Sequence, residues 1–171
     1  MPDWPSPERV ASTPRPTPAR KASDYFRLNL PRGGHQPAVG RFLIAAVVAI
    51  IASLAVCAAI VAIGVTIFPA TAGYDHFRFL DYAKLTVPGV VCAAVSWPIV
   101  TLFSTQARRL FAWLTVVVTL GGMAPDLWIL YRGAPPEAVL ALVIMHLALA
   151  AVTYPALVYI APQRRESSPR A

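Results

Sequence analysis

Residues 42–68 read FLIAAVVAIIASLAVCAAIVAIGVTIF and carry no charged side chain. About 20 apolar residues cross the roughly 30 Å hydrocarbon core of a bilayer, because a helix rises about 1.5 Å per residue. The hydrocarbon core offers no water to the backbone, whereas a helix satisfies its own N–H and C=O groups. The stretch is therefore expected to form a transmembrane helix that is long enough to tilt.

The rest of the chain continues this pattern. Of its 171 residues, 57% are hydrophobic and 13% are charged, whereas about a quarter of an ordinary soluble domain is charged. This composition excludes a water-soluble globular domain. Three further apolar runs, at residues 85–103, 110–130 and 138–160, reach spanning length. Short connections at 104–109 and 131–137 make neighbouring helices antiparallel, so the sequence predicts an all-α membrane protein with a bundle of four antiparallel transmembrane helices over residues 41–161.

Lysine and arginine are distributed unevenly around these spans. Twelve of them lie in residues 1–41, at the 108–109 turn and after residue 160, while the other side has only Arg78, Lys84 and Arg132. Positive charge near the ends of spans is held on the cytoplasmic side. Both termini are therefore expected in the cytoplasm, in a multi-pass protein of the plasma membrane. This topology explains the formal charge of +7, and no nucleic acid partner is expected.

Residues 1–40 form a basic tail that holds eight of the seventeen prolines. Such a segment buries too little apolar surface to offset the entropy of ordering it, so we expect it to be disordered. Its basic residues near the membrane are each attracted to anionic lipid headgroups by about 1 kcal/mol. A second, short cytoplasmic tail is expected at residues 162–171.

The motifs of common enzyme and metal sites are not found in the sequence. Cys57 and Cys92 both lie inside apolar runs, so no disulfide is expected. A glycine-rich phosphate loop, a nucleophile elbow and a metalloprotease helix are missing as well. We therefore expect a protein without catalytic residues, metal or cofactor.

A stripe of small residues runs along the first span. Ala45, Ala49, Ser53 and Cys57 recur at every fourth position, and small side chains on one helical face let another helix approach closely. The stripe is a candidate helix-packing face. The alternative is that an alanine-rich span shows this spacing by chance.

Prolines and glycines interrupt the later spans. Pro98 and Pro155 lie inside their segments and are expected to kink the helices, because proline lacks an N–H and clashes with the preceding turn. Gly121, Gly122 and Pro125 are expected to loosen the outer third of the third span.

Two ionisable side chains lie well inside predicted spans, Asp126 in the third and His146 in the fourth. Ionisable groups in hydrocarbon are costly and are by default hypotheses for functional sites. The short connection makes their helices neighbours, and their depths differ by roughly 6 Å, so we predict that the two side chains face each other. One interpretation is a site that handles protons or binds a ligand. The other is a hydrated Asp126 near Arg132 and a His146 that makes one hydrogen bond between helices.

The loop at residues 69–84, PATAGYDHFRFLDYAK, alternates aromatic and charged side chains. Aromatic residues favour the level of the lipid headgroups, so the loop is expected to lie on the membrane surface. Asp75, His76 and Asp81 are weak candidates for metal ligands, because adjacent Asp and His without a second histidine or a cysteine is poor metal spacing.

The segments ARRLFAWLTVVVTLGGMAPD and ALVIMHLALAAVTYPAL, around Arg108, Arg109, Pro125, Met145 and His146, resemble a family of uncharacterised four-span membrane proteins of actinobacteria. The resemblance covers about residues 41–161. It implies a membrane location and a four-helix fold, and it transfers no catalytic residue.

The sequence thus favours a small non-enzymatic membrane protein, structural or accessory in role, whose partners are the lipid bilayer and either a second copy or a larger membrane complex. The alternative is a small transporter or proton-coupled carrier that uses Asp126 and His146. Four spans are few for alternating access, so this alternative requires a homodimer.

Overall fold

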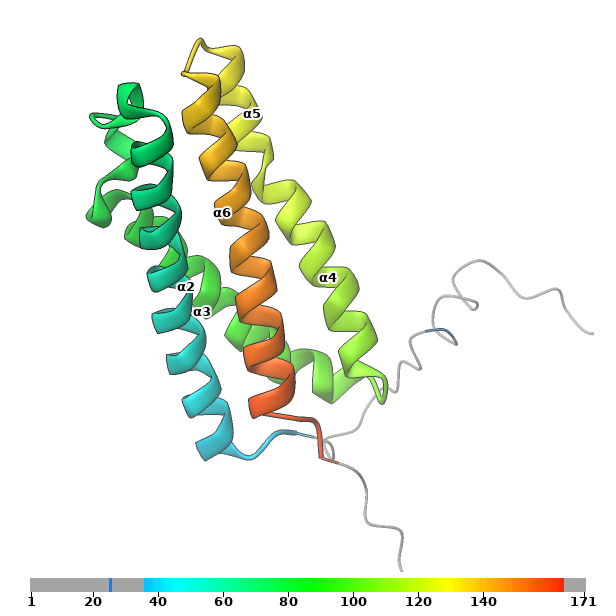
Figure 1. Ribbon diagram of the computed structural model, residues 1–171. Coiled ribbons are helices and arrows are strands. Elements are labelled where there is room, and N and C mark those ends of the chain that lie inside the picture. The colour runs from blue at the N-terminus through cyan, green and yellow to red at the C-terminus, as the bar shows by residue number, and fades with distance from the viewer. Residues whose placement is uncertain (1–24, 26–35, 165–171) are drawn as a thin grey trace, which may run out of the picture.

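The computed structural model describes residue 25 and residues 36–164. The predicted tail at residues 1–40 lies almost entirely outside the described residues, as does most of the predicted tail at 162–171. The elements of the described chain are helices, and four helical segments are long and apolar enough to cross a membrane (Figure 1). The described chain begins and ends at the same end of the molecule, the lower end in Figure 1.

Helix α2, Val39–Ile67, covers the predicted first span except for its last residue, Phe68. Its buried residues are Ala45, Ala49, Ser53 and Cys57, so the stripe of small residues is a packing face within the molecule. The helix packs mainly against α6 and α3. Along the stripe the Ser53 hydroxyl lies 3.3 Å from that of Thr153, and the Cys57 thiol lies 3.8 Å from the Thr86 hydroxyl.

The connection after α2 is shorter than the sequence predicted. Two short 3₁₀ turns, Pro69–Thr71 and Asp75–Phe77, lead into α3, Phe79–Phe103. Helix α3 thus begins ahead of the apolar run at residue 85. The Arg78 carbonyl accepts the first helical hydrogen bonds, and Lys84 pairs with Asp81 one turn earlier at 3.0 Å. Hydropathy marked only the uncharged part of the helix, whereas its first turns contain Asp81 and Lys84.

The third and fourth segments are each interrupted. Helix α4, Ala107–Gly122, is followed by Met123, and α5, Ala124–Tyr131, continues the same segment. This break agrees with the loosening expected from Gly121, Gly122 and Pro125. Helix α6, Pro136–Pro155, passes at its proline into a π-helical turn, Ala156–Ile160. Helix α3 runs as one α-helix through Pro88 and Pro98.

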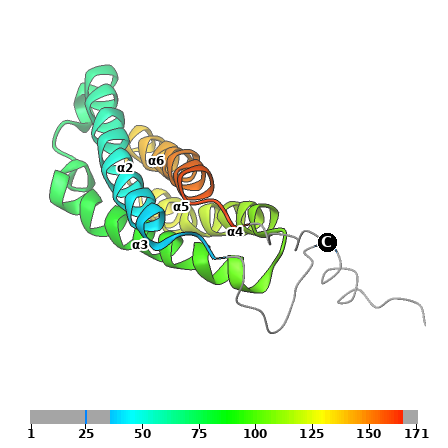
Figure 2. The same cartoon turned by 90° about the horizontal axis from the view of Figure 1, so that it is seen from below.

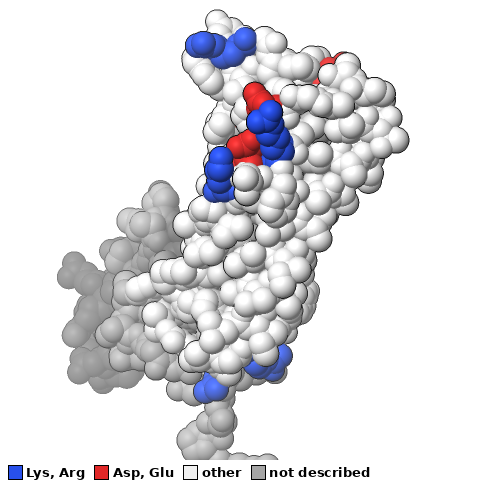
Figure 3. Space-filling view, turned by 90° about the vertical axis from the view of Figure 1, so that its left-hand side faces the viewer, with Lys and Arg blue, Asp and Glu red and all other residues white. Residues whose placement is uncertain are grey.

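Helix α6 lies at the centre of the arrangement. It packs against α2 on one side and against α4 and α5 on the other, and α3 contacts both α2 and α4 (Figure 2). Seen from a third side, lysine and arginine lie toward both ends of the face and acidic residues only toward the upper end, whereas the middle of this face is free of charge (Figure 3). An uncharged middle suits the hydrocarbon core of a bilayer.

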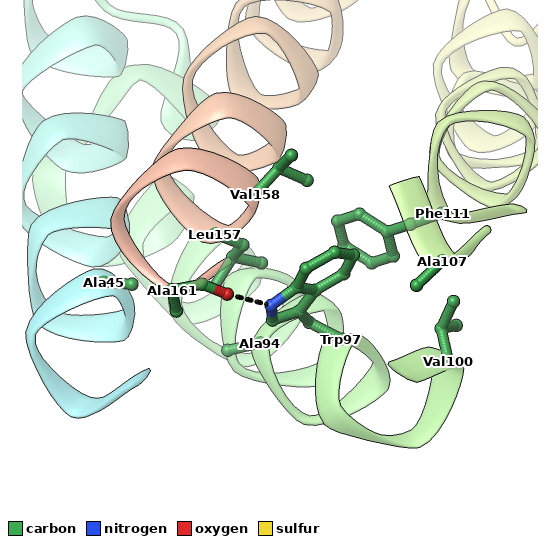
Figure 4. Packing of buried hydrophobic residues seen from close by; sticks show 9 residues of the cluster. All are labelled: Ala45, Ala94, Trp97, Val100, Ala107, Phe111, Leu157, Val158 and Ala161. Carbon is green, nitrogen blue, oxygen red and sulfur yellow. Dashed lines mark hydrogen bonds between the residues drawn. The ribbon is translucent and has the colours of Figure 1, made fainter. Parts of the chain in front are cut away.

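The lower end is held together by a tryptophan. Trp97 of α3 is fully buried, and its ring packs 5.2 Å from that of Phe111 of α4 (Figure 4). Its indole Nε1 donates a 2.7 Å hydrogen bond to the carbonyl of Ala161, just past the π-helical turn. Leu157 and Val158 of that turn are buried in the same cluster. The tryptophan therefore joins α3, α4 and the end of the fourth segment.

Candidate functional site

Asp126 and His146 face each other across the α5–α6 hairpin. The Oδ2 atom of Asp126 lies 2.9 Å from Nδ1 of His146, so the structure places the two side chains in contact. The Asp126 side chain is 9% exposed and that of His146 is 32% exposed. We call these two residues the acid–imidazole pair.

A tight turn brings the two helices alongside each other. After α5 the amides of Gly133 and Ala134 donate to the carbonyls of Leu130 and Ile129, respectively. These hydrogen bonds are typical of an α-helix that ends with one residue in the left-handed conformation. Gly133 has a φ of 93°, a conformation that glycine adopts without steric cost. Pro136 then starts α6 at a position where its missing N–H costs nothing.

The imidazole nitrogen faces two oxygens at once. Nδ1 of His146 lies 3.1 Å from the carbonyl of Leu142, one turn earlier on α6, and forms an aligned hydrogen bond with it. The Oδ2 atom of Asp126 is enclosed and has no aligned hydrogen bond, although Nδ1 lies within reach. The carboxylate is therefore close to a titratable partner but incompletely satisfied, which is costly in an apolar setting.

Gly122 lets α4 approach the imidazole. A Cβ atom placed on Gly122 would lie 3.0 Å from Cδ2 and 3.2 Å from Nε2 of His146. A Cβ atom on Gly121, the preceding residue, would meet nothing within 4 Å. The absence of a side chain at Gly122 thus leaves the space that the His146 ring occupies.

The acid–imidazole pair lines a cavity of about 420 Å³ that lies between α3, α4 and α6. We call it the α3–α4 cavity. Most of its wall is apolar, for example Leu114 of α4 and Leu149 of α6. Leu85 and Val118, on opposite walls, are 73% and 63% exposed. The cavity therefore opens sideways, between the helices, toward the surface that faces lipid in a membrane.

The loop between α2 and α3 reaches over this region. His76 also lines the cavity, and its ring stacks on that of Tyr74 at 5.0 Å. Burial raises the pKa of the Tyr74 hydroxyl, and the carboxylates of Asp126 and Asp75 raise it further. Tyr74 is therefore near enough to the acid–imidazole pair to sense its charge, and it remains a neutral hydrogen-bonding group at physiological pH.

The structure does not bring the three weak metal candidates together. Within residues 36–164 no group of three or more His, Cys, Asp or Glu side chains is placed to hold a metal ion. Asp75 lies 3.6 Å from Arg78, and Asp81 lies 3.0 Å from Lys84. Both carboxylates thus have cationic neighbours in the loop and the first turn of α3.

Sequence reasoning found the acid–imidazole pair but missed the cavity that the pair lines. Its wall is built from α3, α4, α5, α6 and the loop, and hydropathy says nothing about which faces of these helices stay apart. The contribution of Gly122 was missed for the same reason, because a glycine in the sequence does not reveal which side chain approaches it.

Comparison with known protein families gives a match over most of the chain. The model of a family of unknown function (DUF6069) matches residues 34–163. No curated protein matches the chain, and no solved structure matches it.

Proposed function

Since the chain belongs to the family of unknown function DUF6069, we propose a function from the geometry of its membrane domain: it is a non-enzymatic accessory protein of the cell membrane that binds an apolar molecule in the α3–α4 cavity. The observation that carries this proposal is the cavity itself, about 420 Å³ in volume and mostly apolar in its wall. Binding sites for small molecules are concave and mostly apolar, with a few convergent polar groups. The acid–imidazole pair supplies such groups here.

In this proposal the four segments cross the bilayer as antiparallel helices, with both termini in the cytoplasm. The uncharged middle of the face shown in Figure 3 supports this arrangement. So does the position of Arg108 and Arg109 in the first turn of α4, at the lower end where the described chain begins and ends. The sideways opening of the cavity then lies within the bilayer, where an apolar ligand arrives by lateral diffusion.

A cavity-filling substitution tests the proposal. Gly89 lines the cavity, and a Cβ atom added there meets nothing within 4 Å, so Gly89→Phe places a large side chain at the wall without a backbone clash. Val91→Phe is the matched control, because Val91 is 42% exposed and does not line the cavity. Purified full-length protein in nanodiscs is titrated with a fluorescent decyl compound.

We expect saturable binding to the wild type and to Val91→Phe, and its loss in Gly89→Phe. Binding that does not saturate, or that Gly89→Phe leaves unchanged, would show that the probe dissolves in the lipid and that the cavity is not a ligand site. Size-exclusion chromatography and thermal unfolding show whether each variant is folded.

A second candidate function is a small homodimeric transporter or proton-coupled carrier. It is favoured by one observation, the position of a titratable pair, Asp126 and His146, on the wall of the cavity. Histidine titrates near physiological pH, so a carrier would load and release a proton there. Ligand-driven proton movement in proteoliposomes, lost in His146→Gln, would support the carrier, whereas ligand binding without proton movement supports the accessory binding protein.

A further inference from the structure

The α3–α4 cavity has ionisable groups at one end, and most of its remaining wall is apolar. Asp126, His146 and His76 lie toward the α5 side. From there the wall follows α6 away from the pair, past Leu149 and Ala150. A ligand that fills this space has an apolar body and a single polar group, which describes an amphiphile.

The charged residues on the cavity wall determine whether the polar group of the ligand is positive or negative. None of the described residues that line the cavity is lysine or arginine, and two, Asp81 and Asp126, are carboxylates. Asp81 is already paired with Lys84. Asp126 has the His146 imidazole 2.9 Å away and His76 on the same wall, and its enclosed Oδ2 atom lacks an aligned hydrogen bond. The wall therefore has an unsatisfied acceptor and no fixed positive charge.

We propose that the α3–α4 cavity binds a long-chain amine, with its ammonium group on the Asp126 carboxylate and its alkyl chain along α3, α4 and α6. This inference deepens the proposed function and rests on it. An ammonium group supplies the donor that Oδ2 lacks, and a charge-assisted hydrogen bond is about twice as strong as a neutral one. An anionic headgroup would be buried beside a carboxylate without a compensating cation, which is strongly unfavourable.

The amine and the His146 imidazole are alternative partners for the same carboxylate. Nδ1 of His146 also has the Leu142 carbonyl as an acceptor, so the ring keeps one hydrogen bond when an ammonium group approaches Asp126. The site thus accepts the amine without leaving the histidine unpaired.

Three probes that differ only at the chain end test the proposal. Each has a dansyl group on a decyl chain that ends in an amine, a hydroxyl or a carboxylate, and each is titrated into full-length protein in neutral phosphatidylcholine nanodiscs. We expect the amine to bind about tenfold more tightly than the alcohol. A hydrogen bond between charged groups is stronger than a neutral one by roughly the free energy that corresponds to a tenfold change in affinity. The carboxylate probe should bind most weakly.

Asp126→Asn removes the charge and keeps the shape, so the amine and the alcohol should bind equally. Asp126→Glu restores a carboxylate and should restore part of the preference. The matched control is Asp75→Asn, because Asp75 lies in the loop, outside the cavity wall, and it should keep the full preference. The ranking of the probes on the wild type tests the proposal even where a variant does not fold.

The outcomes separate the two proposals. Three results would overturn the amine assignment. The wild type could bind the amine and the alcohol equally, it could bind the carboxylate more tightly than the amine, or folded Asp126→Asn could keep the preference for the amine. If Gly89→Phe still abolishes binding in those cases, the apolar binding function stands. If no probe saturates on the wild type, the proposed function itself fails and the amine assignment falls with it.

Discussion

His146 stabilises a buried carboxylate, and the two side chains come from neighbouring helices. An imidazole 2.9 Å from Asp126 Oδ2 offsets part of the cost of enclosing that oxygen. Removal of one member of a buried polar pair leaves the other without a partner, and this loss exceeds what the intact pair contributes. The free energy of unfolding is therefore expected to depend on whether the side chain at residue 146 is polar.

His146→Gln and His146→Leu test the contribution of a polar side chain at this position. Glutamine keeps a hydrogen-bonding group and should leave the free energy of unfolding within about 1 kcal/mol of the wild type, whereas leucine should lower it by about 1–3 kcal/mol. Thermal or denaturant unfolding in detergent measures the difference. Equal stability of the two variants would show that His146 contributes no polar stabilisation to Asp126.

Gly122→Ala tests the close approach of α4 to the same ring. The added methyl group would lie 3.0 Å from His146 Cδ2, so the ring must shift, and we expect a loss of about 1 kcal/mol, at the low end of overpacking effects. Gly121→Ala is the matched control, with open space at its Cβ position. It should gain up to about 1 kcal/mol from helix propensity. The free energies of unfolding of the two variants should therefore change in opposite directions, and a stable Gly122→Ala with an unshifted histidine would contradict the described geometry.

At the scale of elements, α2 is fixed in rotation by its stripe of small residues. Ala45, Ala49, Ser53 and Cys57 are all fully buried, and the helices packed on them leave no room for larger side chains. A helix that is apolar all round has no other obvious signal of which face is inside, so the small residues determine that face.

Ala49→Leu is expected to destabilise the protein by about 1–3 kcal/mol, because added methylene groups overpack the contact between α2 and its neighbours. Ala58→Leu makes the same change at an exposed position of the same helix and should have little effect. Thermal unfolding of the two variants in one detergent compares them directly. If both variants melt like the wild type, the stripe is not a tight contact.

Much of the helical arrangement could be predicted from the sequence, because the signals are local. Span lengths follow from apolar runs, the α4–α5 break follows from Gly121, Gly122 and Pro125, and the α2 face follows from residue size. The early start of α3 at Phe79 could not be predicted from hydropathy. The bond from Trp97 to Ala161 and the α3–α4 cavity depend on how helices far apart in the chain pack, and a single sequence does not contain that information.

At the scale of the whole molecule, the two ends differ in how the chain is held. The lower end is joined by the Trp97 cluster and by side-chain bonds such as Arg41 Nε to the Ile160 carbonyl, 2.7 Å. The α3–α4 cavity begins at Phe111 of that cluster and extends between α3 and α4 toward Asp126 of α5. We therefore expect ligand binding to change the dynamics of the cavity side more than those of the lower end.

The proposed orientation can be measured with single cysteines. In a background with Cys57 and Cys92 replaced by alanine, Phe79→Cys should react with an impermeant maleimide in intact cells, and Arg164→Cys should react only after lysis. This result follows if the end with fewer lysines and arginines faces outward. The reverse pattern would invert the orientation and place the loop at residues 68–78 in the cytoplasm.

The π-helical turn Ala156–Ile160 makes this part of the chain sensitive to the deletion of a single residue. A π turn holds one more residue than an α turn, since its hydrogen bonds run from i to i+5. That extra residue sets the register in which the Ala161 carbonyl meets the indole of Trp97. Deletion of a single codon within the turn would therefore regularise the helix and at the same time remove the acceptor from Trp97, so loss of one residue is expected to be more harmful here than many substitutions.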